Sequence, residues 1–414
     1  GIRRRKEIEV MGGAKFNHLG RGAVQRYTKE WRVTVERMGR WVDMDFDYRT
    51  MDPDYMESIW WVMKQLHDRG LLYEGYKSMH ICPRCQTTLS NFEVSQGYKD
   101  ITDLGVTAMF ELEQGQEGQK GKKGKTYVLA WTTTAWTLPG NLFLALSREI
   151  PYVRVAHEGA SYVLAKARLN EGFRGKAYSI EEEWPGGSAL FGKPYTPLFS
   201  YETDHERDKA FRIVDGTAFV STEEGTGVVH IAPAFGEDDY AVGKREGVEV
   251  LQHVGPDGRF KDIVRDFAGL EVKPADDPQA TDRKIAAWLQ AHGKLFVAAP
   301  YPHSYPHCWR CDAPLLNYAT SSWFVAVEKI KEQLLATNVE TTWVPGHIRD
   351  GRFGKWLEGA RDWAVSRQRY WGTPLPIWRC EETGELEVLG SRDDVIARKR
   401  IRFTRITVLR HGES

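Results

Sequence analysis

The sequence has no excess charge of either sign, because 57 Lys and Arg residues balance 57 Asp and Glu residues among 414. A nucleic-acid-binding protein of this composition needs local basic patches, since the whole chain gives no electrostatic steering. No segment resembles a membrane span or a signal peptide, and no internal repeat is visible. We therefore expect a cytoplasmic protein of two or three domains with no membrane partner.

Cysteine is scarce, and four of the five residues fall into two pairs of identical spacing, Cys82 with Cys85 and Cys308 with Cys311. A pair of this spacing at a turn directs two thiolates at one metal ion, and two pairs complete a tetrahedral zinc site. This pattern argues against a secreted disulfide scaffold. We predict one structural zinc ion, since four thiolate ligands leave no open position for catalysis.

The two cysteine pairs lie far apart in the sequence. If they share one ion, the segment between them leaves a host domain and returns to it, as an inserted domain does. Redox activity or simple burial of one pair is the alternative. For Cys380 we expect a packed thiol, with half of a second zinc site as the alternative.

Hydrophobic patterning predicts a helix in the first part of the chain and a β-rich domain after it. Asp52 is placed to cap the helix, Pro53 suits its first position and Gly70 suits its end. Its apolar face is expected to carry Met56, Ile59, Trp60, Met63 and Leu66. Short alternating runs between Gly-, Pro- and Asp-rich turns predict strands at 106–112, 127–131, 152–156, 211–214 and 227–231.

Hydroxyl side chains crowd the segment 131–141, which contains Thr132, Thr133, Thr134 and Thr137. Threonine beside a strand often only supplies β-propensity. Packed hydroxyls also hold water and the polar end of a substrate, while their methyl groups shape a pocket. Both interpretations stay open on this pattern alone.

A second candidate segment, 225–240, runs from a predicted strand through a Pro- and Gly-containing turn into an acidic helix start. Asp239 in this position either caps the helix or, beside a pocket, binds an ammonium group through a charge-assisted hydrogen bond. His230 by itself is more typical of a satisfied, partly buried histidine than of a catalyst.

The peptides WTTTAWTLPGN (131–141) and GTGVVHIAPAFGEDDY (225–240) resemble the two signature peptides of the editing domain of isoleucyl-tRNA synthetases. Related valyl and leucyl enzymes carry a Thr-Arg-Pro type peptide, so the threonine run favours the isoleucyl family. Ala135 stands where this family more often has proline, and we expect little consequence.

The resemblance covers about residues 1–395, and segments 38–66, 304–325 and 362–378 contribute to it. It implies an α/β fold, in which part of a Rossmann-type class I catalytic domain carries an inserted β-rich, barrel-forming editing domain on zinc-stapled stalks. The editing reaction it implies is the hydrolysis of valyl-tRNA(Ile).

The resemblance also assigns roles within the site. Asp239 would hold the α-ammonium group of the misattached amino acid, and His230 would help to exclude an isoleucyl group. The pocket would be lined, and its water placed, by Thr132, Thr133 and Thr134. No strong general base is visible, so we expect catalysis to depend on positioning the water and the ester, with help from the ribose hydroxyl.

The resemblance also assigns roles to three further residues of the peptide 131–141. Thr137 and Asn141 would extend the pocket wall, and Trp136 would pack beside the terminal adenosine. The implied partners are the acceptor end of tRNA(Ile) and its valine and isoleucine esters, bound by a monomer.

Two ATP-binding motifs of the family, of the His-Ile-Gly-His and Lys-Met-Ser-Lys-Ser types, do not occur in these 414 residues. We therefore expect an internal piece of a longer protein, in which amino-acid activation with ATP and magnesium belongs to the full-length enzyme only.

The expected organisation has six parts. These are a helical part of the catalytic domain or connective region (1–75), a first zinc stalk (76–104), the editing domain (105–300), a returning zinc stalk (301–325), the second half of the Rossmann domain (326–400) and a C-terminal segment (401–414). Within the editing domain, the Gly- and Lys-rich stretch 115–125 is expected to form a solvated hairpin tip.

Two other segments allow alternatives. Residues 366–372 combine arginines with aromatic residues, which suits either a solvated helix end or contact with the tRNA acceptor end. Arg410, His411, Gly412 and Glu413 after a predicted strand resemble the opening of a histidine-phosphatase domain, where the histidine is phosphorylated. A chance match in a linker is the other interpretation, and His411 is expected to be inert in this chain.

Three alternative functions remain. A piece of a valyl or leucyl synthetase conflicts with the threonine run. A non-catalytic, zinc-stapled tRNA-binding module predicts that Asp239 is dispensable. A free-standing deacylase conflicts with the half catalytic domain that the resemblance implies.

Overall fold

The structure is a computed structural model that describes residues 5–113, 124–201, 208–398 and 407–408. The chain divides into two compact units. One comprises residues 1–76, 85–90 and 321–414, and the other comprises 77–84 and 91–320. The 115–125 stretch lies mostly outside the described residues, and so does the proposed histidine-phosphatase motif at 410–413.

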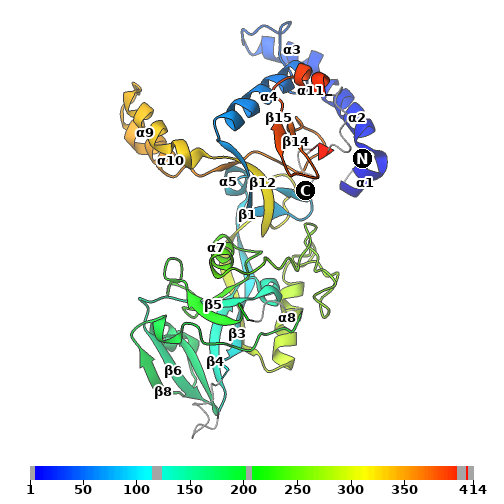
Figure 1. Ribbon diagram of the computed structural model, residues 1–414. Coiled ribbons are helices and arrows are strands. Elements are labelled where there is room, and N and C mark those ends of the chain that lie inside the picture. The colour runs from blue at the N-terminus through cyan, green and yellow to red at the C-terminus, as the bar shows by residue number, and fades with distance from the viewer. Residues whose placement is uncertain (1–4, 114–123, 202–207, 399–406, 409–414) are drawn as a thin grey trace. The chain divides into compact units, whose positions relative to one another are not determined.

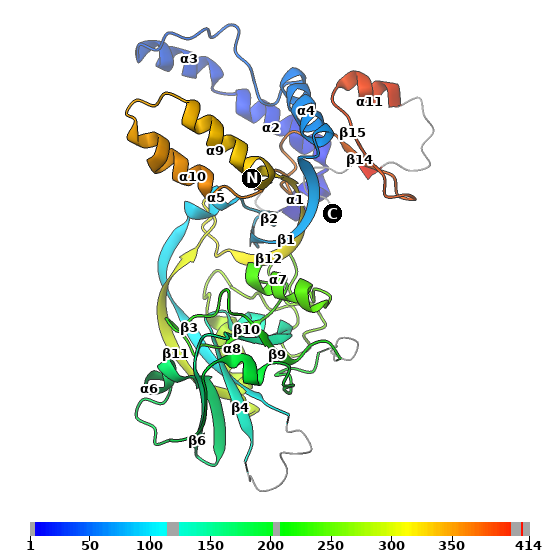
Figure 2. The same cartoon turned by 60° about the vertical axis from the view of Figure 1, so that its left-hand side comes forward.

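The unit formed by residues 77–84 and 91–320 contains an open six-stranded sheet of order β11-β3-β4-β7-β6-β8. Its strands are β3 (Tyr98–Glu111), β4 (Thr126–Thr132), β6 (Tyr152–His157), β7 (Ala160–Ala165), β8 (Ser179–Trp184) and β11 (Leu295–Pro306). Strands β4 and β7 are parallel, whereas the other neighbours are antiparallel. Figure 2 shows β3 and β11 side by side, with Tyr98 opposite Pro306.

A second sheet of the same unit has the order β10-β5-β9. Strand β5 is labelled in Figure 1, and β9 and β10 are labelled in Figure 2. It consists of β5 (Phe143–Leu146), β9 (Arg212–Asp215) and β10 (Val229–Ile231). The unit's longer helices are α7 (Glu237–Glu246) and α8 (Ala280–Ala291), and shorter turns are α5 (Asn91–Ser95), η2 (Ala135–Gly140), η3 (Lys166–Arg168), α6 (Leu169–Gly172) and η4 (Gly187–Leu190). All five predicted strands of this region are present, although β3 begins at Tyr98, well before the predicted start at 106.

A closed barrel was expected here and is not seen among the described residues, where the strands form two separate sheets. The alternating apolar residues of both sheets meet in one core, in which Phe110, Leu144 and Tyr152 are fully buried. Burial of this kind contributes roughly 1.5–3 kcal/mol for each large side chain. The fold is therefore mixed α/β, with β-rich local structure but no barrel closure.

The unit formed by residues 1–76, 85–90 and 321–414 is mainly helical. Its helices are α1 (Arg5–Met11), α2 (Gly13–Gln25), α3 (Thr28–Arg37), α4 (Pro53–Asp68), η5 (Val327–Ile330), α9 (Lys331–Glu340), η6 (Arg349–Phe353), α10 (Gly354–Glu358) and α11 (Arg392–Arg398). The predicted helix at 52–70 is confirmed as α4, with Gly70 in the left-handed conformation (φ 66°) that suits a helix end. Met63 of its apolar face is buried against Trp323 and Ile377.

Two small sheets complete this unit, of orders β13-β12-β1-β2 and β15-β14-β16. Their strands are β1 (Leu72–Cys82), β2 (Thr87–Thr88), β12 (Leu316–Val325), β13 (Trp363–Ala364), β14 (Ile377–Arg379), β15 (Leu386–Val388) and β16 (Thr407–Val408). The pairings β12–β13, β14–β15 and β14–β16 are antiparallel, whereas a Rossmann sheet is parallel. The assignment of residues 326–400 to the second half of a Rossmann domain stays a prediction.

Candidate functional site

A pocket of about 320 Å³ opens in the β-rich unit, beside the ends of β4 and β10. It brings together the two peptides that the sequence singled out, although these lie about ninety residues apart in the chain. The residues that line it are Trp131, Thr132, Thr133, Thr134, Thr137, Phe219, Ser221, Glu224, Gly225, Thr226, Gly227, Val228, Val229, His230, Phe235 and Asp239.

The threonine run forms a turn at the end of β4. The Thr134 backbone N–H donates to Oγ1 of Thr132 over 3.0 Å, and the two side-chain oxygens are 3.1 Å apart. The short helix η2 begins directly afterwards, where the backbone N–H of Thr137 donates to the Thr134 carbonyl over 2.9 Å. Side chain and backbone therefore fix each other, and three neighbouring threonines, Thr132, Thr133 and Thr134, line one cavity.

His230 lies on β10 opposite Leu144 and is largely buried, with 7% of its surface exposed. Its Nε2 is 3.0 Å from Oγ1 of Thr137, and this hydroxyl donates its only hydrogen to the Thr134 carbonyl over 2.8 Å. The hydroxyl must therefore accept from His230, which assigns the neutral tautomer with hydrogen on Nε2. Burial, followed by the effect of His253, lowers the pKa of His230 to about 4, so the ring is uncharged near neutrality.

Asp239 enters the pocket from the first turn of α7. Its Oδ2 accepts a hydrogen bond of 2.9 Å from the backbone N–H of Ala232, which fixes the carboxylate. Gly236 precedes the helix, and a Cβ at that position would lie 2.8 Å from Cγ of Asp239, so glycine leaves room for the carboxylate. Burial raises the pKa of Asp239 to about 7 despite the hydrogen bond from Ala232. An ammonium group would supply the charge partner that this half-buried carboxylate lacks in the cavity.

Two predicted site residues lie elsewhere. Trp136 is 1% exposed and packs edge-on against Phe235, outside the residues that line the pocket. Asn141 is also buried and accepts a 2.6 Å hydrogen bond from the Tyr195 hydroxyl, while its amide donates to the Phe143 carbonyl over 2.9 Å. Their packing explains both positions, and neither side chain reaches the cavity.

One wall of the pocket was missed by sequence reasoning. Phe219, Ser221 and Glu224 come from a loop without a chemical motif. Its end carries Gly225 and Gly227 with φ of 66° and 71°, and these closely spaced glycines before a strand were the available hint. Glu224 accepts a hydrogen bond that raises the pKa of the Tyr301 hydroxyl to about 12.

The four cysteines predicted to bind zinc form one cluster, in which all Sγ atoms lie within 4.8 Å of one another. A tetrahedral zinc ion with Zn–S bonds of about 2.3 Å holds its sulfur ligands about 3.8 Å apart, so the spacing suits this ion. The residue after each pair, Gln86 and Asp312, has a positive φ of 51° and 65°. Each pair thus ends in a tight turn of the same kind, and the arrangement suits a structural metal with four thiolate ligands.

The segment 366–372 lies in the other unit. Oγ of Ser366 is 2.7 Å from Oγ of Ser322 and accepts from the Trp323 backbone over 3.0 Å. The guanidinium of Arg367 donates to the carbonyls of Ala364 and Ser366. These bonds hold the local backbone, and contact with tRNA stays a prediction.

Residues 1–410 match the family model of the class I tRNA synthetases (I, L, M and V). Isoleucine–tRNA ligase of Treponema denticola is 46% identical over 95% of this chain and 38% of its own length, and that of Bdellovibrio bacteriovorus is 48% identical over 95% and 36%. The chain thus spans somewhat over a third of the length of these relatives.

A crystal structure of GlLeuRS-CP1 is 16% identical, with a TM-score of 0.37, covering 47% of this chain and 98% of that chain. The P. knowlesi cytosolic leucyl-tRNA synthetase editing domain is 13% identical, with a TM-score of 0.29, covering 37% and 67%.

None of the helices in the described part of the chain has the length and apolarity that crossing a bilayer requires. The family match covers nearly the whole sequence, including both pocket peptides and both cysteine pairs. The chain belongs to the class I tRNA synthetases of the I, L, M and V group.

Proposed function

We propose that this chain is part of an isoleucine–tRNA ligase and carries its editing site, which hydrolyses valyl-tRNA(Ile). One observation carries the proposal: Asp239, His230 and the threonine run line a single pocket of about 320 Å³. The similarity to isoleucine–tRNA ligases over 95% of the chain supports it.

In this proposal, Asp239 binds the α-ammonium group of the misattached amino acid. The carboxylate is fixed by Ala232 and stands at the first turn of α7, where the helix dipole favours a negative charge. Its elevated pKa reflects the cost of burying this charge, which no cation among the described residues offsets. A bound ammonium group removes that cost, so the site selects the amino-acid end of the substrate.

The hydroxyl groups of Thr132, Thr133 and Thr134 place a water molecule against the ester carbonyl. Water adds to this carbonyl, the ester C–O bond breaks, and valine and the ribose hydroxyl of tRNA leave. Neutral His230 is only a weak base, because its pKa is about 4, so we assign it no proton transfer. Catalysis therefore depends on holding water and ester together, with the neighbouring ribose hydroxyl assisting proton transfer.

Size discrimination explains why such a pocket is needed. A site that accepts isoleucine rejects valine poorly, because one methylene group is worth only about 1–3 kcal/mol, a limit for which this pair is the standard example. A second pocket that is too small for isoleucine admits the valyl ester and hydrolyses it. His230 and Thr137 form its rigid inner wall, since each is buried and bonded to the other.

The four-cysteine cluster holds a structural zinc ion in this proposal, and hydrolysis needs no metal. Cys82, Cys85, Cys308 and Cys311 bind the ion and connect the ends of the β-rich unit. For the complete protein we propose ligation of isoleucine to tRNA(Ile) with ATP and magnesium, in the cytoplasm and as a monomer.

The test is release of valine from valyl-tRNA(Ile) by the purified chain, with isoleucyl-tRNA(Ile) as the control substrate. We expect selective hydrolysis that the variant Asp239→Ala loses. Equal hydrolysis of both esters, or full activity in the variant, would contradict the proposal. A non-catalytic tRNA-binding module would bind both substrates and release neither amino acid.

A further inference from the structure

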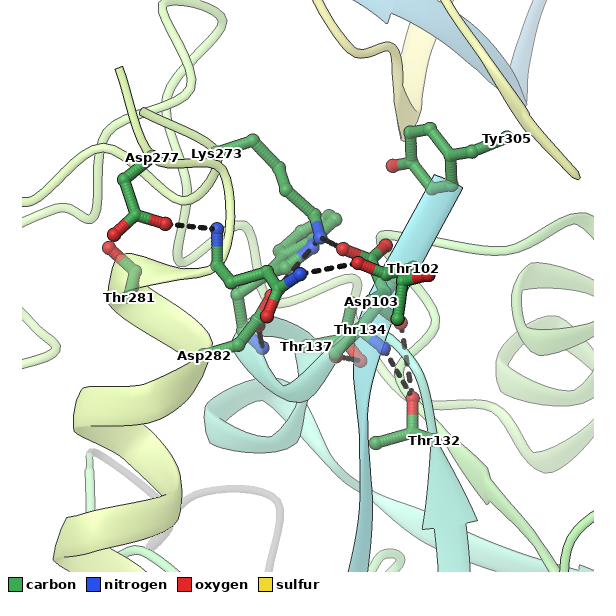
Figure 3. Close-up of polar contacts among 12 residues, drawn as sticks. Thr102, Asp103, Thr132, Thr134, Thr137, Lys273, Asp277, Thr281, Asp282 and Tyr305 are labelled. Carbon is green, nitrogen blue, oxygen red and sulfur yellow. Dashed lines mark hydrogen bonds and ion pairs between the residues drawn. The ribbon is translucent and has the colours of Figure 1, made fainter. Parts of the chain in front are cut away.

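Three charged side chains from separate parts of the chain meet in the interior of the β-rich unit (Figure 3). Nζ of Lys273 is 3.0 Å from Oδ1 of Asp103 and 3.1 Å from Oδ2 of Asp282. Each of these side chains is at most 1% exposed. A buried ion group of this kind costs several kcal/mol of desolvation for each ion, so packing alone does not explain it.

The second oxygen of Asp282 connects this ion group to the pocket. Oδ1 accepts a hydrogen bond of 3.2 Å from the backbone N–H of Trp136, in the first turn of η2. Thr134, the residue before η2, makes no side-chain capping bond to the helix. Asp282 on α8 therefore caps η2 from another element, as a carboxylate at a helix start commonly does.

The capped turn lies between two residues of the pocket. Trp136 stands between Thr134 and Thr137, and both threonines line the pocket. Thr137 is bonded to Thr134 and His230, so a shift of η2 would move three groups of the pocket together. Asp282 itself does not line the cavity.

The remaining bonds of the ion group hold Asp282 in place. Lys273 binds both carboxylates, and Nε2 of His303 is 3.2 Å from Oδ2 of Asp103. Asp103 lies on β3 and His303 on β11, two strands paired along their whole shared length. The carboxylate of Asp282 is thus fixed against the main sheet, although it is contributed by α8.

We infer that Asp282, oriented by Lys273, is a positioning residue of the editing pocket that fixes the threonine turn through the Trp136 amide. The inference rests on the proposed hydrolysis of valyl-tRNA(Ile). It assigns Asp282 a role at a distance, in which the residue sets the rate of hydrolysis without touching the substrate.

Two double variants separate the Trp136 acceptor from the buried charge. Asp282→Asn with Lys273→Gln removes both charges but keeps an oxygen for the Trp136 amide. Asp282→Leu with Lys273→Met also removes both charges and provides no acceptor. Both variants leave Asp103 without Lys273 and with His303 still beside it, so this cost is common to the two proteins and cancels in their comparison. The control is Asp277→Ala, since Asp277 precedes α8, pairs with exposed Arg283 and makes no bond to η2.

Valyl-tRNA(Ile) hydrolysis is measured by steady-state kinetics, and a melting curve establishes that each variant is folded. We expect the Leu/Met variant to lose about tenfold or more in kcat with KM within about twofold, since one misplaced group commonly costs that much. The Asn/Gln variant and Asp277→Ala should stay within about threefold of the unchanged chain. Equal kcat in the two double variants would overturn the inference.

Amide hydrogen exchange of the peptide 131–141 gives a second readout that does not need activity. We expect faster exchange at Trp136 in the Leu/Met variant than in the Asn/Gln variant, and unchanged exchange in Asp277→Ala. If the unchanged chain releases no valine, the proposed function fails, and exchange still decides whether Asp282 fixes the turn. Identical exchange in both double variants would refute that role.

Discussion

The backbone N–H of Ala232 points at Oδ2 of Asp239 over 2.9 Å and is the hydrogen-bond donor that fixes this carboxylate in the pocket. The bond favours the ionised form, yet burial outweighs it and raises the pKa of Asp239 from 3.8 to about 7. The residue proposed to bind an ammonium group therefore changes its charge near physiological pH.

This change of charge predicts how the rate of hydrolysis depends on pH in the acid range. Only the carboxylate form of Asp239 attracts the ammonium group, so kcat/KM for valyl-tRNA(Ile) hydrolysis should rise tenfold per pH unit below about pH 7 and level off above it. The measurement is kcat/KM between pH 5 and 8 at constant ionic strength, with Glu237→Gln as the control from the same helix turn. A rate independent of pH over this range would contradict the assignment.

The same pKa predicts a stability change of defined sign. The folded-state pKa of Asp239 exceeds its unfolded value of 3.8, so the folded protein binds the proton more tightly. The stabilisation by that proton is complete below about pH 4 and is lost as the pH rises through about 7. Asp239→Asn should remove this decline. Urea unfolding of both proteins at pH 4.5 and 7.5 should show the variant gaining stability relative to the unchanged chain at the higher pH.

Thr137→Val tests the bond between Thr137 and His230. Valine keeps the shape of threonine but leaves the buried Nε2–H of His230 without its acceptor, which costs about 1–3 kcal/mol. Thr126→Val, on β4 and outside the residues that line the pocket, serves as the control. We expect only Thr137→Val to lower the urea midpoint and the hydrolysis rate. Equal effects of the two substitutions would show that the His230 contact contributes nothing.

The parts of the fold that sequence predicted are those with a local pattern. Helix α4 follows from its apolar face and end residues, and strands such as β4 and β6 follow from alternation between turns. Barrel closure, which the resemblance implied, is not seen in the described strands. Local alternation could not correct this expectation, because it carries no trace of pairing between distant strands. The antiparallel pairing of β14 was missed for the same reason.

The candidate site, too, was predicted only in part from the sequence. Thr132, His230 and Asp239 stand in recognisable peptides, and the structure places them around one cavity. Trp136 and Asn141 stand in the same peptides, yet burial directs them into the core. The group of Asp103, Lys273 and Asp282 was invisible in the sequence, since its members lie far apart and none belongs to a motif. Its detection required the side-chain distances.

The cysteine cluster predicts one metal equivalent per chain. Cys308→Ser should lose the zinc and lower the melting temperature, because a structural zinc contributes folding free energy directly. Cys380→Ser is the matched control, since Cys380 lies outside the cluster. Metal content by mass spectrometry and melting curves with and without a chelator provide the measurement. Zinc retained by Cys308→Ser, or lost from Cys380→Ser, would contradict the ligand assignment.

Gly236→Ala tests whether the space beside Asp239 matters for function. Gly236 has an extended backbone that alanine adopts freely, with φ of −157° and ψ of 150°. The added Cβ would instead lie 2.8 Å from Cγ and 2.9 Å from Oδ1 of Asp239, closer than real contacts allow. The carboxylate must therefore move away from its bond with Ala232, while the helix α7 is retained.

We expect Gly236→Ala to raise KM for valyl-tRNA(Ile) by roughly tenfold, in proportion to a weakened charge-assisted bond of about 1.5 kcal/mol. The melting temperature should fall by only a few degrees. Gly22→Ala is the control, because a Cβ there meets nothing within 4 Å and its backbone is helical. Since the substitution removes no functional group, a raised KM would show that the position of Asp239, and not merely its presence, determines ammonium binding. Wild-type kinetics would show that the carboxylate works equally well from a displaced position.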